Sequence, residues 1–130
     1  KVDRLHIKIP AGSRIAVDTQ MIPTNELIHE NYFGLFQIRN KGFDLGFVLQ
    51  RAGGKVTTEL YDPELDLKIL LWQETGEWKY NYLQVFIPPS RSSIAIEPMT
   101  CAANAFNNKM GLIILEPQQS FTANCGVRLD

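Results

Sequence analysis

The sequence predicts an all-β fold, an antiparallel β-sandwich, and three observations support it. Apolar and polar residues alternate with a period of two in many short segments, which places their side chains on opposite faces of a strand. Turn residues separate nearly all of these segments, and no window of helical length keeps a sustained apolar spacing of three to four residues. Many short strands with regular interruptions are typical of sheets that pack their apolar faces together.

The alternation predicts the strands one by one. The first strand is expected from Leu5 to Ile9, where every second residue is apolar. The other expected strands are Ile15 to Val17, Phe43 to Leu49, Lys55 to Tyr61, Leu67 to Trp72, Tyr82 to Ile87, Ser93 to Glu97, Gly111 to Glu116 and Phe121 to Leu129. Only Cys101 to Asn107 is expected to form a short helical turn.

Proline, glycine and small polar residues predict where these strands end. The expected connections are a break at Pro10 to Ser13, a polar loop ending at Pro23-Thr24-Asn25, a hairpin at Arg51 to Gly54, a turn at Asp62-Pro63 and a tight loop at Pro88 to Arg91. No repeat, low-complexity segment or linker interrupts the pattern, so residues 1–130 are expected to belong to one domain.

The composition and net charge of the chain argue against some classes of binding partner. Of the 130 residues 45% are hydrophobic, enough for a sizeable core, and 13 basic side chains against 14 acidic ones leave a net charge of −1. This balance argues against nucleic acid and anionic membranes as partners. The most apolar run, Gly111 to Leu115, is much shorter than a membrane span, and no targeting peptide is visible at Lys1, so a soluble, cytoplasmic protein is expected.

Two cysteines, Cys101 and Cys125, are too few for a disulfide scaffold and lack the paired spacing of a zinc site. Two reduced thiols are the simplest interpretation, and the sequence leaves open whether they pair. No metal site and no cofactor are expected.

Glu97 is the residue that attracts attention as a possible acid or base. It is expected to end the strand that begins at Ser93, and Pro98 after it disfavours the helical region for the residue before the proline. A carboxylate at the end of a rigid strand, followed by a loop, is well placed to face a cleft. The alternative is an ordinary solvated residue at the rim of a sheet.

Several ordered blocks of sequence then resemble the C-terminal end of the aldose 1-epimerase (galactose mutarotase-like) family. The blocks are Ser-Ile-Ala-Ile-Glu-Pro-Met-Thr at 93–100, Asn-Ala-Phe-Asn at 104–107, Gly-Leu-Ile-Ile-Leu-Glu-Pro at 111–117 and Ser-Phe-Thr-Ala at 120–123. Upstream, Ile-Pro-Thr-Asn-Glu at 22–26 is similar to a family turn that usually reads Pro-Thr-Gly-Glu, and asparagine is the commonest non-glycine residue at positive φ. Phe43-Asp44 looks like the family's Phe/Tyr-Asp element.

The resemblance implies a specific chemistry. Glu97 falls where the family keeps its catalytic base, and Asp44 where it binds substrate hydroxyls; from position alone, Asp44 is equally well explained as a turn residue before a strand. The implied enzyme is an isomerase that interconverts the α and β anomers of a hexose or hexose phosphate by acid/base ring opening, without a cofactor. Five aromatic side chains are candidates for a stacking wall, although core packing is the favoured explanation for each: Phe36, Phe43, Trp72, Trp78 and Phe86.

The chain also departs from the family. The family's histidine acid lies in a segment before the strand that resembles Leu5 to Ile9, and no such segment is present; His29 is expected in an exposed loop and His6 at a polar strand position. The sequence therefore predicts the C-terminal portion of a larger, supersandwich-type domain, inactive without its partner, the N-terminal half. Pro98-Met99-Thr100 replaces the Thr-Gln that better-known galactose mutarotases have after the glutamate, which leaves the sugar open.

Two other functions stay open at this point. A missing acid favours a non-catalytic carbohydrate-binding sandwich that keeps the cleft but not the proton transfer. A structural β domain with a protein partner would show a contiguous exposed apolar patch. Whether a phosphate is recognised is also open, because Arg39, Arg51, Arg91 and Arg128 stand in no diagnostic motif.

Overall fold

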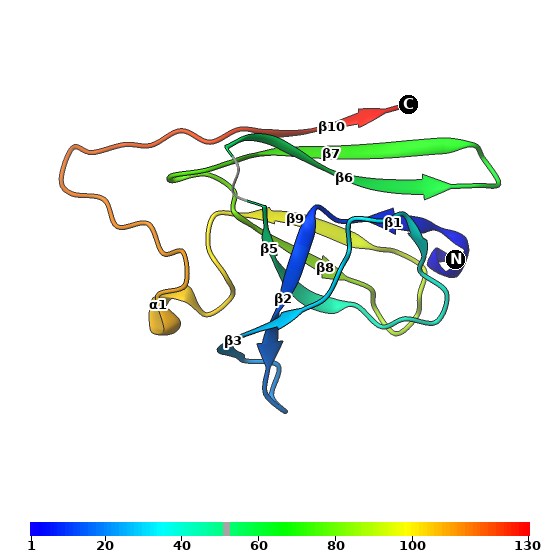
Figure 1. Cartoon of the computed structure of the whole chain (residues 1–130), viewed down its shortest axis with the longest axis horizontal. Coiled ribbons are helices and arrows are strands. Elements are labelled where there is room, and N and C mark those ends of the chain that lie inside the picture. Colours follow the sequence, from blue (N-terminus) through cyan, green and yellow to red (C-terminus); the bar gives the residue numbers. More distant parts are fainter. Residues whose placement is uncertain (51–52) are drawn as a thin grey trace.

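The structure is a computed structural model that describes residues 1–50 and 53–130. Figure 1 shows two antiparallel sheets, with sheet A at the top of the view and sheet B below it. The described part of the chain is therefore an all-β, antiparallel sandwich, as the sequence predicts. Helical structure among these residues is confined to a 3-10 turn at Val2–Arg4 and the single turn α1 at Ala105–Asn108.

Each sheet has five strands. In spatial order, sheet A consists of β10 (Cys125–Leu129), β7 (Leu67–Thr75), β6 (Gly54–Asp62), β1 (His6–Lys8) and β4 (Phe36–Gln37). Sheet B consists of β3 (Pro23–His29), β2 (Ala11–Val17), β5 (Asp44–Leu49), β8 (Tyr82–Phe86) and β9 (Ala95–Met99). The chain crosses between the sheets several times, so both sheets depend on residues distant in sequence.

The apolar faces of the sheets meet in one main core. Ile7 of β1, Phe47 of β5 and Leu83 of β8 are fully buried there, and the ring of Tyr32 packs edge-on against Phe47 at 4.9 Å between centroids. The buried members of this core are Val2, Ile7, Ile9, Ala11, Ile38, Phe43, Phe47, Leu49, Leu60, Leu83, Val85 and Ile87. Because strands of both sheets supply them, the core fixes how one sheet lies on the other.

A second, smaller core lies on the outer face of sheet B. Ile15, Tyr82 and Ala102 are buried there, with Met99 and Met110 packed against them. The backbone of Gly111 approaches Tyr82 so closely that an added Cβ would meet Cε2 of its ring at 2.3 Å. The segment after β9 is therefore held against the outer face of sheet B.

Most of the predicted elements are confirmed, with small shifts at their ends. The strands expected at 5–9, 43–49, 55–61, 67–72 and 82–87 are present as β1, β5, β6, β7 and β8. The helical turn expected within 101–107 is α1, and the tight loop at Pro88 to Arg91 closes through a bond from the Arg91 N–H to the Pro88 carbonyl. The turn at Asp62-Pro63 joins β6 to β7.

The expected break at Pro10 to Ser13 is largely wrong, because β2 begins at Ala11. Pro10 carries the chain from sheet A to sheet B, after which β2 pairs with both β3 and β5. The polar loop expected to end at Asn25 is present but shorter, since it spans residues 18–22 and β3 starts at Pro23. Asn25 does adopt positive φ (69°), but inside a strand whose register shifts opposite Ile15 and Val17, so it forms a bulge.

Two predictions in the C-terminal third are wrong in extent. Gly111 to Glu116 is not a strand, and of Phe121 to Leu129 only Cys125–Leu129 is one. Figure 1 shows the chain between α1 and β10 running as an extended arm from sheet B to sheet A. Apolar residues in this arm fit the pattern of a strand, but within residues 1–50 and 53–130 no strand pairs with them.

The hairpin predicted at Arg51 to Gly54 includes residues 51 and 52, which lie outside the described residues. The strands on either side, β5 and β6, belong to different sheets, so they do not form a hairpin with each other. The edge strands β3, of seven residues, and β4, of two, are additional elements that the alternation does not predict.

Glu74 fastens the end of the arm to β7. Its carboxylate accepts the backbone N–H of Asn124 at 3.0 Å, the side-chain amide of Asn124 at 3.1 Å and the ammonium of Lys79 at 3.1 Å. These bonds lower the pKa of Glu74 below its usual range, and the bond from the Asn124 side chain has the largest effect. A carboxylate with a lowered pKa stabilises the folded state at neutral pH, and this contribution is lost as the pH falls through that pKa.

We expect Glu74→Gln to loosen the arm without unfolding the sandwich. Hydrogen exchange measured by NMR should show lower protection at Asn124 and its neighbours, and unchanged protection in β8. The wild type should lose the same protection on acidification. Glu77→Gln, at an exposed glutamate of the next turn, is the matched control; equal protection in both variants would contradict this function of Glu74.

Candidate functional site

Glu97 lies in the middle of β9, the edge strand of sheet B. The prediction that it ends its strand is wrong, because β9 continues through Pro98 to Met99, paired with Leu83 and Tyr82 of β8. An edge strand tolerates the proline, which has no N–H to donate. The Glu97 side chain is exposed, and its carboxylate makes no hydrogen bond or ion pair with the part of the chain that the structure describes.

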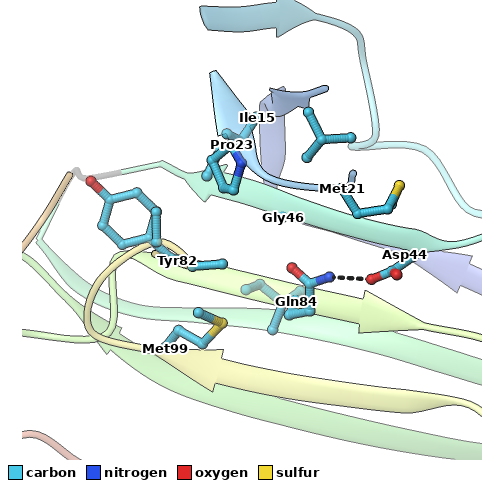
Figure 2. Close-up of a pocket in the computed structure, with 12 residues that line it drawn as sticks. Ile15, Met21, Pro23, Asp44, Gly46, Tyr82, Gln84 and Met99 are labelled. Carbon is cyan, nitrogen blue, oxygen red and sulfur yellow. Dashed lines mark hydrogen bonds between the residues drawn. The ribbon is translucent and has the colours of Figure 1, made fainter. Parts of the chain in front are cut away.

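Asp44 is the first residue of β5 and is also exposed. Its Oδ1 accepts a hydrogen bond of 2.8 Å from the side-chain amide of Gln84, drawn as a dashed line in Figure 2. Directly across the ladder from Asp44 is Phe86 of β8, an aromatic side chain that remains 38% exposed. One carboxylate oxygen of Asp44 is thereby engaged.

Gln84 connects the two predicted site residues. It lies directly opposite Glu97 on one side and Gly46 on the other, and directly opposite residues in an antiparallel ladder share one face of the sheet. Asp44 occupies the same face of β5 as Gly46, two residues away. The structure therefore brings Asp44, Gln84 and Glu97 together on the outer face of sheet B, a set that we call the polar stripe.

The sequence prediction missed Gln84. A signal was present, since Gln84 alternates with the apolar Leu83 and Val85 and must lie on the polar face of its strand. What the alternation does not show is which strand lies beside β8. The register that places Gln84 between Gly46 and Glu97 exists only once the sheet has formed.

Gly46, opposite Gln84, has no side chain that would crowd the polar stripe. A Cβ at this position would lie 3.2 Å from Oε1 of Gln84 and 3.4 Å from Cδ1 of Ile15. The glycine thus leaves room for the Gln84 amide to turn its nitrogen toward Asp44.

A small hollow of about 40 Å³ adjoins the polar stripe (Figure 2). Asp44 and Gln84 form part of its lining, and apolar side chains that include Ile15, Met21 and Met99 form most of the rest. Glu97 is outside this lining, across the ladder from Gln84. Complete ligand pockets usually measure about 300–1,000 Å³, so the hollow can take one small group of a ligand whose body lies over the exposed stripe.

Neither histidine lies at the polar stripe. His29 is the last residue of β3, where its ring lies 3.4 Å from the Ser13 hydroxyl, so the expectation of a loop position is wrong. His6 is on a strand as predicted, but in sheet A, and its Nδ1 is buried without a hydrogen-bond partner among the described residues. A histidine acid is thus not part of this face in residues 1–50 and 53–130.

Only one of the five candidate aromatic residues lies beside the stripe, namely Phe86. Phe43 is buried in the main core, and Phe36 packs against that core. In sheet A, the Lys55 ammonium lies 4.0 Å from the centroid of the Trp72 ring. The Trp78 ring packs edge-on against Phe121 of the arm. For these four, packing is the observed role.

A second polar cluster joins β2 to the segment after β3 and shares no residue with the stripe. Glu30 accepts hydrogen bonds from the Tyr32 hydroxyl and from the Arg14 guanidinium, the latter at 3.2 Å. Burial, and then the bond to Glu30, raises the pKa of Tyr32 to about 12, while these bonds lower the pKa of Glu30. The cluster holds the chain after β3 over Phe47, against which the Tyr32 ring packs, and it has a structural role.

Cys101 and Cys125 are both free thiols, the first half-buried and the second exposed. Within the described residues, no group of three or more histidine, cysteine, aspartate or glutamate side chains is arranged to hold a metal ion. In the same residues, no helix combines the length and the apolar character needed to cross a membrane.

Comparison with known proteins gives no family for the chain. No protein-family model matches it, and no curated protein does. The resemblance to aldose 1-epimerases thus depends on the sequence blocks quoted above. The polar stripe and the hollow beside it are independent of that resemblance, since they follow from the register of the strands.

Proposed function

We propose that this sandwich is part of an aldose 1-epimerase-like isomerase, which interconverts the α and β anomers of a hexose or hexose phosphate. The observation that carries the proposal is the polar stripe, in which two carboxylates flank one amide on an exposed sheet face. Carboxylates accept hydrogen bonds and an amide both donates and accepts, so the stripe suits a ligand with several neighbouring hydroxyl groups. The resemblance of residues 93–123 to the family supports the same reaction.

Glu97 is the proposed general base. Its carboxylate is exposed and free of partners in the described chain, so it is available to take the proton from the anomeric hydroxyl. As that proton leaves, a carbonyl forms at the anomeric carbon, the bond from this carbon to the ring oxygen breaks, and an acid protonates the ring oxygen. Rotation and ring closure by the reverse steps give the other anomer.

Asp44 is the proposed binding residue. Gln84 engages its Oδ1 at 2.8 Å and so orients the carboxylate, leaving the other oxygen to accept a sugar hydroxyl. The exposed face of Phe86, across the ladder, offers an apolar surface for the C–H groups of the ring.

The acid is proposed to come from the N-terminal half of a larger domain, as the departures from the family sequence predict. The position of the two histidines supports this, because one is on β3 and the other is in sheet A. The same observation favours a second candidate function, a carbohydrate-binding sandwich without catalysis. The two candidates share the polar stripe and differ in whether Glu97 transfers a proton.

Sugar binding at the stripe can be measured without catalysis. We expect ligand-observed NMR titration with neutral hexoses to show saturable binding, and Asp44→Asn to weaken it about 10- to 100-fold, because a charge-assisted hydrogen bond is lost. Asp66→Asn, at an exposed position in the β6–β7 turn, is the control. Binding that is equally strong in both variants would refute both candidate functions at this face, and absent binding would refute them for unphosphorylated hexoses.

A further inference from the structure

The hollow beside the polar stripe is apolar on most sides and has no cationic side chain in its lining. Its walls include Ile15, Met21, Tyr82, Met99 and Ala102, and no described lysine, arginine or histidine lines it. Asp44, at the edge shared with the stripe, is the one carboxylate among the described residues of the lining. The local charge is therefore negative, and Glu97 on the neighbouring strand adds to it.

The walls of the hollow are packed in place by the smaller core. Ile15, Tyr82 and Ala102 are nearly inaccessible to solvent, and Met99 packs against them. The close approach of Gly111 to the Tyr82 ring holds the covering segment against the sheet. Packed residues thus set the size and the apolar character of the hollow on this side, while Met21, from the loop before β3, forms its exposed rim.

This environment is unsuited to a phosphate. A phosphate group carries about −1.5 to −2 charges and is usually bound by arginine, lysine or backbone N–H groups at a helix end. Arg91 is held by Asp3 and by the backbone carbonyls of Lys41 and Arg39, and Arg128 pairs with Asp130. Neither reaches the hollow, where a phosphate would face Asp44.

We infer that the ligand of this site is an uncharged sugar with a small apolar substituent, such as the methyl group of a 6-deoxyhexose, which occupies the hollow. A volume of about 40 Å³ suits a small group of that kind, since a cavity of roughly 10–15 Å³ already holds one water molecule. The sugar hydroxyls then lie over Asp44, Gln84 and Glu97. This inference rests on the proposed function, and it narrows the substrate to unphosphorylated sugars.

The test compares matched sugars on the same protein by NMR titration. The probes are glucose and galactose, their 6-deoxy counterparts and their 6-phosphates. We expect each 6-deoxy sugar to bind at least about tenfold more tightly than its 6-hydroxy counterpart. Apolar pockets typically discriminate about 10- to 100-fold against a ligand that carries one additional hydroxyl. The 6-phosphates should show no binding at the same concentrations.

Met21→Arg provides a gain-of-binding variant. Met21 is 49% exposed at the rim of the hollow, so an arginine can be placed there without disturbing the core, and it should allow the 6-phosphates to bind. Leu65→Arg adds the same charge at an exposed position of the β6–β7 turn, away from the hollow, and should not.

The outcomes separate this inference from the proposed function. If the 6-hydroxy sugars or the 6-phosphates bind to the wild type as tightly as the 6-deoxy sugars, and binding still depends on Asp44, the inference fails and the proposed function stands. If none of the six sugars binds, both fail.

Discussion

Replacing Glu97 with glutamine is expected to slow anomer exchange by about 10²- to 10⁴-fold, the contribution typical of a positioned general base. Glutamine keeps the size of the side chain and can still hydrogen-bond to a sugar, but it cannot take a proton. Because Glu97 is exposed on an edge strand and its carboxylate makes no hydrogen bond or ion pair with the described residues, the variant should fold normally. Binding of the sugar should therefore persist while the exchange rate falls.

The measurement is exchange between the anomeric proton signals of a sugar by NMR, on full-length protein that includes this segment. Glu26→Gln is the matched control, since Glu26 is an exposed glutamate on β3, in the same sheet but at its opposite edge. If Glu97→Gln and Glu26→Gln exchange sugars at the wild-type rate, the proposed catalytic function fails. If the wild type binds sugars but does not accelerate exchange, the non-catalytic binding function is the correct one.

Replacing Phe47 with alanine is expected to lower the free energy of unfolding by about 3–5 kcal/mol, enough to unfold many domains of this size. Phe47 is fully buried, and its ring meets Tyr32 edge-on at 4.9 Å, so the substitution leaves a cavity and removes an aromatic contact. Urea unfolding followed by tryptophan fluorescence or circular dichroism measures the change.

Phe106→Ala is the control for the loss of a phenyl ring. Phe106 is 84% exposed on α1, so its removal should change the free energy of unfolding by less than about 0.5 kcal/mol. Similar midpoints for the two variants would mean that Phe47 does not belong to the core. A changed urea dependence with Phe47→Ala would instead indicate a more open folded state.

The sequence predicts the sandwich well because both faces of the strands are marked by alternation, as in Leu5 to Ile9 and Tyr82 to Ile87. It fails where a strand depends on its neighbours. β3 is mostly exposed and polar, so only its pairing with β2 makes it a strand, whereas the apolar run from Leu112 to Leu115 pairs with no strand of the described chain and remains an arm. Local pattern does not contain this information.

The candidate site shows the same division. Asp44 and Glu97 can be identified from sequence blocks, but their relation to each other cannot, because 52 residues separate them in the chain. The pairing register of β5, β8 and β9 determines that relation, because it places Gln84 between the strands of Asp44 and Glu97. The hollow is equally invisible in the sequence, since it combines side chains from β2, the loop before β3, β8 and the segment after β9.

Pro98 has one more consequence, for the accessibility of its neighbour. An unpaired strand edge is a template on which another extended chain can dock, and docking there would cover the side chain of Glu97. A proline has no N–H to donate to a docking chain. It therefore interrupts a ladder that such a chain would form beside Glu97, while β9 stays paired with β8. The residue that misled the strand prediction thus protects the free border of the sheet against aggregation.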